Sequence, residues 1–164
     1  MNEIPSMWRK ELLHPLFVHF PIGLLIITAL VGIAAILFRN KKYAGKLRFN
    51  FSLQLFLGII LFWITFYTGQ IAYGVEVRKI CDPTVLKDHL YWAYVAGYIF
   101  SAGALIELVR LIWRKKIAFL LFLAVALSVG GALSLTYAGH LGARVVYQQA
   151  AGVYHPSPDC TEFE

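Results

Sequence analysis

Histidine is the residue type in this sequence best suited to holding a cofactor. The chain contains five: His14, His19, His89, His140 and His155. A neutral imidazole offers a nitrogen lone pair to a metal, and two imidazoles on opposite sides can hold the iron of a haem. Convergent imidazoles therefore suit two cofactor classes, a haem b with two axial histidines or a small metal ion with three or four ligands.

The composition indicates the class of protein in which these histidines lie. The chain has 164 residues, of which 59% are hydrophobic and 15% charged. Soluble domains contain about 45–50% apolar and about 25% charged residues, so the composition argues against a soluble or disordered chain. Four apolar stretches have or approach bilayer-spanning length, at residues 16–38, 51–69, 90–109 and 117–139. We expect one all-α integral membrane domain over residues 1–164.

The connections between these stretches predict their arrangement. They are short, so consecutive helices should be antiparallel neighbours in an up-down-up-down four-helix bundle. Asp82 followed by Pro83 is typical of a helix start, which predicts that the third helix begins well before its apolar stretch. The fourth helix has no breaker directly after Gly139, so we expect it to extend beyond the membrane.

The positions of the basic residues predict the orientation of the bundle. Nine of the 15 Lys and Arg residues lie in the loops after the first and third spans, and eight of the nine acids lie on the opposite side. The positive-inside rule then places both loops in the cytoplasm and both termini outside. The nine basic residues are Arg39, Lys41, Lys42, Lys46, Arg48, Arg110, Arg114, Lys115 and Lys116.

This orientation places all five histidines on the outer side. Ionisable side chains at membrane depth are costly and usually face the bundle interior. The first and third helices are diagonal in such a bundle, and a haem between two imidazoles needs more room than the roughly 8–10 Å between neighbouring helices. We therefore expect His19 and His89 to be the preferred axial pair. His140 and His14 are candidates for a second haem or another metal, with hydrogen bonding to a propionate as the alternative for His140.

Small residues lie close to these histidines along the helices: Gly23, Ala93, Gly97, Gly139 and Gly142. Gly23, Ala93 and Gly97 would leave room for a flat macrocycle. Small residues in membrane helices equally permit close helix packing, so both interpretations remain open.

Three further features have simpler interpretations. Cys81 and Cys160 both fall on the outer side, where a disulfide between them is the simplest expectation, with metal ligation or free thiols as alternatives. Glu107 lies near the cytoplasmic end of its span with Arg110 one turn later, so we expect it to pair or to snorkel. Thr65 in the second helix, near the histidine level, could donate a hydrogen bond to a ligand.

Two segments resemble a known family. They are residues 14–25, with the sequence HPLFVHFPIGLL, and residues 139–147, with the sequence GHLGARVVY, followed by Gly152 and Val153. They are similar to the small four-helix bacterial membrane domains of unknown function called DUF 2231. Some relatives of this type are joined to cytochrome c or Rieske domains, and in one branch the segment around His140 and a His three residues before a Trp recur, here His89. The resemblance implies redox work at the outer membrane face.

These features favour a membrane cytochrome b-like electron-transfer subunit that binds haem b, one or two per chain. The chain lacks a Cys-X-X-Cys-His motif, so any haem is non-covalent. The alternatives are a protein that binds copper or another metal, or assists oxidase assembly, and a cofactor-free structural subunit. Expected partners are membrane lipid, respiratory or photosynthetic membrane subunits, a periplasmic redox protein and quinone. Soluble-enzyme motifs are absent, so a stand-alone enzyme is less favoured, and nucleic acid is an unnecessary partner.

Overall fold

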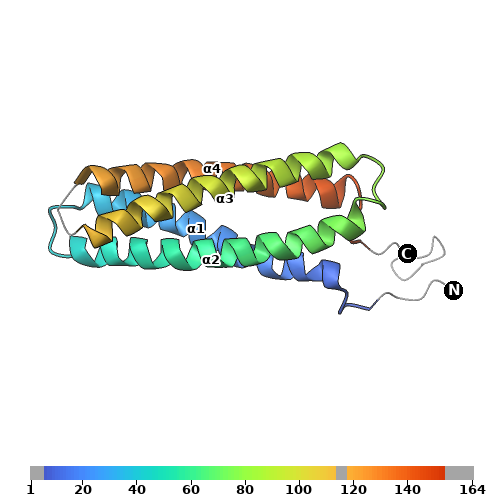
Figure 1. Cartoon of the computed structure of the whole chain (residues 1–164), viewed down its shortest axis with the longest axis horizontal. Helices are drawn as coiled ribbons and strands as arrows, with labels where there is room; N and C mark the ends of the chain where they lie inside the picture. Colours follow the sequence, from blue (N-terminus) through green and yellow to red (C-terminus); the bar gives the residue numbers. More distant parts are fainter. Residues whose placement is uncertain (1–5, 114–117, 154–164) are drawn as a thin grey trace, which may run out of the picture.

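The structure is a computed structural model that describes residues 6–113 and 118–153. Within these ranges the chain is helical and has no strand. A short 3-10 helix, η1 (Lys10–Leu12), leads into α1 (Leu13–Leu37), and the remaining helices are α2 (Ala44–Glu76), α3 (Pro83–Ile112) and α4 (Ala118–Tyr147). Figure 1 shows them side by side as an elongated bundle. The prediction of an all-α bundle of four helices is confirmed.

All four helices are long and apolar enough to cross a membrane. α2 has 33 residues, which corresponds to about 50 Å of helix against about 30 Å of bilayer hydrocarbon. Many large apolar side chains are exposed, including Leu30 at 60% and Leu105 at 61%. An apolar exterior on helices of this length is what lipid contact requires. The helices are longer than the apolar stretches, because their ends continue through polar residues.

Local sequence signals determine two of the helix ends. Asp82 is the N-cap of α3, where its Oδ1 accepts hydrogen bonds from the backbone N–H of Thr84 at 2.9 Å and from its hydroxyl at 2.6 Å. The Thr84 hydroxyl and backbone donors together lower the pKa of the Asp82 carboxyl below its ordinary value. α4 continues to Tyr147, beyond Gly139. Both predictions, an early start for α3 and an extended α4, are confirmed.

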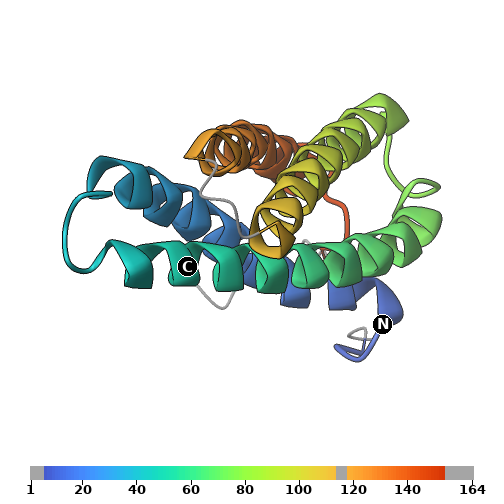
Figure 2. The same cartoon turned by 60° about the vertical axis from the view of Figure 1, so that its left-hand side comes forward.

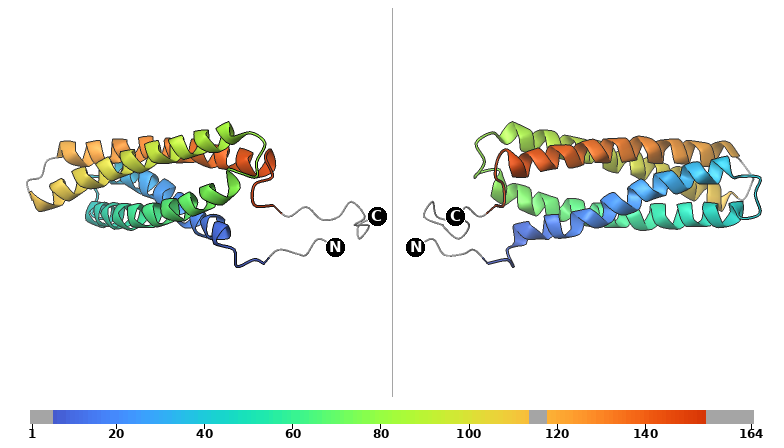
Figure 3. Two further views of the ribbon diagram at one scale, coloured as in Figure 1. Left: turned by 45° about the vertical axis from the view of Figure 1, so that its right-hand side comes forward. Right: turned by 180° about the vertical axis from the view of Figure 1, so that it is seen from behind.

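The bundle consists of two antiparallel hairpins. α1 packs along α2 and α3 packs along α4, whereas α1 and α3 lie diagonally, as expected, and their backbones do not come close to each other. We call the end with the loops after α1 and α3 the loop end, and the opposite end, with the α2–α3 connection, the terminal end (Figures 1 and 3). Figure 2 shows α2 and α3 close together near the loop end and diverging toward the terminal end.

The core is built from aromatic rings packed against glycines. Phe51 and Phe100 are fully buried. A Cβ added at Gly32 would lie 2.9 Å from the Phe51 ring, and one added at Gly131 would lie 2.8 Å from the Phe100 ring. These glycines therefore let each ring reach the backbone of a neighbouring helix, a packing that brings membrane helices close together.

A buried ion pair within α3 is linked to α2 by a hydrogen bond near the loop end. The Glu107 side chain is fully buried and accepts two hydrogen bonds from Arg110, Nε to Oε2 at 2.7 Å and Nη2 to Oε1 at 2.6 Å. Ser52 on α2 also donates its hydroxyl proton to Glu107 Oε1. The expected pairing of Glu107 with Arg110 is confirmed, and Ser52 is a partner that the sequence did not indicate.

Candidate functional site

His14 lies in the first turn of α1 and is half-buried against α2. Its Nδ1 is 3.1 Å from the backbone carbonyl oxygen of Thr65 on α2. A carbonyl oxygen only accepts, so Nδ1 must be the nitrogen that carries the proton in this contact. In the neutral ring Nε2 then keeps its lone pair, the form that binds a metal.

His89 repeats this arrangement in the other hairpin. It lies on α3, half-buried against α4, with Nδ1 2.8 Å from the backbone carbonyl oxygen of Ala138. The same reasoning assigns the proton to Nδ1 and the lone pair to Nε2. A hydrogen bond from the second ring nitrogen to a carbonyl is the usual means by which proteins orient a metal-binding histidine.

The two oriented rings meet across the bundle. Their centroids are 6.3 Å apart, with 67° between the ring planes. In the described part of the chain, Nε2 of neither ring takes part in a hydrogen bond. Since α1 and α3 are diagonal, this contact bridges the two hairpins at the end where they diverge.

Each ring packs closely against a glycine of the neighbouring helix in its own hairpin. A Cβ at Gly69 on α2 would lie 3.0 Å from Nδ1 and 3.1 Å from Cε1 of His14. A Cβ at Gly142 on α4 would lie 3.1 Å from Cε1 and 3.3 Å from Nδ1 of His89. Both positions therefore favour glycine, because a larger residue would push the ring out of its hydrogen bond.

The structure places the other two described histidines outside this site. His19 follows His14 by five residues, which turns its side chain about 140° around α1, and it is exposed. The expected pair of His19 and His89 is therefore not brought together in the structure, where His14 takes that position. His140 is also exposed, with its ring stacked on Tyr137 at a centroid distance of 6.4 Å. His155 lies outside the described residues.

The structure also shows the surroundings of the small residues that were expected to make room for a macrocycle. Gly23 is exposed and a Cβ there would contact nothing within 4 Å. Gly97 is buried, and its Cβ would lie 2.6 Å from the Phe62 ring, so Phe62 already covers that surface. Ala93, one turn after His89, is half-buried. The space at Gly97 thus serves packing of α2 against α3, the simpler of the two interpretations.

A cluster of aromatic rings joins α2 and α3. Phe66 on α2 packs on Tyr94 of α3 with ring centroids 4.6 Å apart, and Trp63 contacts Tyr98 at 6.1 Å. Trp63 also donates its indole N–H to the Ser101 hydroxyl at 3.1 Å. These contacts connect the two hairpins in addition to the pair of histidines.

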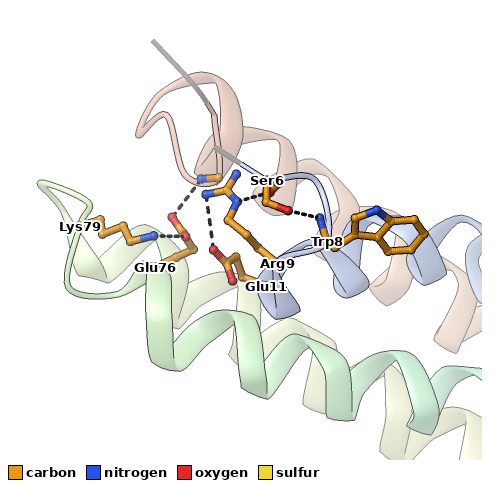
Figure 4. Close-up of polar contacts among 7 residues, drawn as sticks. Ser6, Trp8, Arg9, Glu11, Glu76 and Lys79 are labelled. Atoms are coloured by element: carbon orange, nitrogen blue, oxygen red, sulfur yellow. Dashed lines mark hydrogen bonds and ion pairs between the residues drawn. The ribbon is translucent and has the colours of Figure 1, made fainter. Parts of the chain in front are cut away.

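Polar contacts close the terminal end. Glu76, the last residue of α2, is buried and accepts hydrogen bonds from Lys79 at 2.9 Å and from the backbone N–H of Gly152 at 2.9 Å (Figure 4). The Gly152 contact attaches the segment after α4 to α2. Arg9 and Glu11 pair nearby at 3.4 Å. The sequence analysis did not single out Glu76, although an acid at a helix end after an apolar span was a usable signal.

The cysteine prediction concerns both described and undescribed residues. Cys81 is exposed in the connection between α2 and α3. Cys160 lies outside the described residues, so the disulfide stays a prediction. Among residues 6–113 and 118–153, no group of three or more His, Cys, Asp or Glu side chains is placed to hold a metal ion.

The fold and the site define a class: a four-helix membrane protein with one inward-facing histidine from each hairpin. The chain belongs to the family described as "Predicted membrane protein (DUF2231)", whose model matches residues 10–155. The expected family is thereby confirmed. No curated protein and no solved structure matches the chain.

Proposed function

We propose that this protein is a membrane cytochrome b-like electron-transfer subunit that holds one non-covalent haem b between His14 and His89. The observation that carries the proposal is the distance of 6.3 Å between the two ring centroids. The two rings come from opposite hairpins, and each is oriented by a backbone carbonyl, from Thr65 or Ala138.

The spacing of the rings matches two-sided ligation of one metal atom. A metal–imidazole bond is about 2.0–2.1 Å long and the ring centroid lies about 1.1 Å behind the nitrogen, so two opposed ligands have centroids about 6.2–6.4 Å apart. The observed 6.3 Å equals this separation, so two Nε2 atoms directed at one metal atom would need no change in the distance between the rings.

One polar group close in the chain to the His14 contact would suit the carboxylate arms of a haem. Gln70 follows Gly69, whose backbone contacts the His14 ring, and its buried Nε2 has no hydrogen-bond partner among the described residues. An amide N–H left without a partner is costly, and a propionate oxygen would satisfy it.

The bound haem would supply one-electron redox chemistry. The residues of this chain would supply its two histidine ligands and the backbone carbonyls that orient them. The loops after the first and third apolar stretches contain nine of the 15 Lys and Arg residues in the sequence, which favours a cytoplasmic loop end and a periplasmic haem in a bacterial inner membrane. A periplasmic redox protein and membrane quinone are then the expected electron partners.

A reduced-minus-oxidised visible spectrum of the purified protein tests this proposal. Sharp low-spin haem bands are expected in the wild type and in the His19→Ala variant. They should be lost in His14→Ala and in His89→Ala, because each removes one axial ligand. All four proteins should elute at the same volume in gel filtration, which separates loss of ligand from loss of fold.

The possible results distinguish the alternatives. A wild type without haem bands overturns the proposal, and stoichiometric copper in that protein would assign the same two imidazoles to a copper ion. Unchanged haem in both His14→Ala and His89→Ala overturns the ligand assignment. Loss of haem in His19→Ala alone would restore the pairing expected from the sequence.

A further inference from the structure

A groove lies between α2 and α3 at the loop end, in the opposite half of the bundle from the histidines. Its volume is about 490 Å³, within the range of ligand sites in proteins. Most of its wall is apolar, formed by Phe49, Leu53, Phe56 and Leu111. The groove therefore suits a hydrocarbon chain along most of its length.

The polar part of the groove is built around Arg110. This side chain lines the groove, and its Nε and Nη2 are bonded to the buried Glu107 carboxylate. A guanidinium has five N–H donors, and this ion pair uses two of them. Because Glu107 is fully buried and also held by Ser52, the guanidinium is fixed and its unused donors are available to an anion on the open side.

Arg48 supplies a second cation to the same groove. It is exposed, one turn after the start of α2, and has no acidic partner among the described residues. The other described basic residues of the loop end lie in the loop after α1 and the first turn of α2, and Glu107 is already paired with Arg110. Arg48 lies three residues before the apolar stretch that begins at residue 51, so we expect it at the depth of lipid headgroups.

We propose that this groove binds one anionic phospholipid. Its phosphate lies between Arg48 and Arg110, where planar guanidinium groups match the geometry of phosphate oxygens. One acyl chain follows the apolar wall. The charge complementarity favours an anionic lipid over a zwitterionic one, and the apolar length favours a lipid over a free phosphate. The site is independent of the histidines and of the proposed haem.

Native mass spectrometry of the detergent-solubilised full chain measures this binding directly. The protein is titrated with dioleoyl phosphatidylglycerol or dioleoyl phosphatidylcholine, and the fraction with one bound lipid is counted. We expect tighter binding of phosphatidylglycerol. Arg48→Gln should weaken it about fivefold, since one cation near an anionic headgroup contributes on this order. Lys42→Gln is the matched control, because Lys42 is an exposed cation of the same end that does not line the groove.

A second pair of variants tests the apolar wall without changing any charge. Leu53 and Leu57 are similarly exposed on α2, at 44% and 48%, but only Leu53 lines the groove. Leu53→Trp should fill the groove and lower phosphatidylglycerol binding, whereas Leu57→Trp should leave it unchanged. This pair remains informative if Arg48→Gln does not fold.

Several outcomes overturn the proposal. Equal binding of the two lipids, or equal losses in Arg48→Gln and Lys42→Gln, would mean that the groove does not select an anionic headgroup. Unchanged phosphatidylglycerol binding in Leu53→Trp would mean that the acyl chain does not occupy the groove. Displacement of the lipid by inorganic phosphate at constant ionic strength would assign the arginines to a free anion instead.

Discussion

The glycine behind the His14 ring provides the sharpest test of the proposed ligand pair, because changing it leaves both imidazoles in place. In Gly69→Ala, the new Cβ would lie 3.0 Å from Nδ1 and 3.1 Å from Cε1 of His14. Ordinary contacts begin at 3.4 Å, so the ring must move by a few tenths of an ångström. This movement is directed against the hydrogen bond from Nδ1 to the Thr65 carbonyl.

The energetic consequences can be separated. Overpacking costs about 1–3 kcal/mol, and a weakened hydrogen bond costs about 0.5–1.5 kcal/mol. Replacing Gly by Ala inside a helix stabilises the folded state by about 1 kcal/mol, because Ala has the higher helix propensity. We expect Gly69→Ala to lower overall stability by roughly 0.5–3.5 kcal/mol. Haem affinity should fall by at least about tenfold, as is usual when the group that orients a metal ligand is disturbed.

Gly74→Ala is the matched control. Gly74 lies on α2 five residues further on, and a Cβ there meets nothing within 4 Å. This variant gains the same helix propensity without touching the site, so its stability should rise slightly and its haem content should equal that of the wild type. The assay is titration of haem into the detergent-solubilised protein, followed by Soret absorbance and thermal unfolding. Equal haem affinity in the two variants would refute the assigned role of His14.

Further predictions concern other parts of the molecule. Arg110→Leu leaves the buried Glu107 carboxylate unpaired and should destabilise the protein by about 3–5 kcal/mol, measured by thermal unfolding in detergent. The pKa of Asp82 is lowered in the folded state, so its cap contributes above the unfolded pKa and is lost as the pH falls through the lower, folded value. Acid titration of helix content should therefore show a step at low pH that is absent in Asp82→Asn. Cys81 should react with a membrane-impermeant thiol reagent after reduction from the periplasmic side, and labelling from the cytoplasmic side alone would reverse the proposed orientation.

Helix positions and ends could be predicted from the sequence because their causes are local. An apolar stretch of sufficient length specifies a span, and Asp82 with its following proline specifies the start of α3 through a hydrogen bond within three residues. Glu107 and Arg110 are one helical turn apart, so their pairing was also visible. The family could be recognised from two short segments, residues 14–25 and 139–147, which lie toward the two ends of the chain.

The choice between His14 and His19 could not be made in this way. In a soluble helix, amphipathicity indicates which face is buried. α1 is apolar around its whole circumference, so its sequence does not indicate which of the two histidines faces inward. The orientation of α1 follows from its packing against α2. The hydrogen bond from His14 to the backbone carbonyl of Thr65 could not be predicted, because no sequence pattern indicates which carbonyl will accept it. Gly142 illustrates the same limit: the sequence shows it as a small residue two positions after His140, but the side chain that packs against it is the His89 ring.

The two hairpins have a consequence for assembly. Each carries one imidazole and its own acceptor, His14 with Thr65 in the first and His89 with Ala138 in the second. Each half is therefore oriented before the halves meet, and neither alone can ligate from both sides. Under the proposed function, the cofactor would join two half-sites, each of which is formed within its own hairpin. Two fragments, cut in the connection between α2 and α3 and expressed together, would become a single spectroscopic species only when they pair, so the colour of the preparation would report association of the halves.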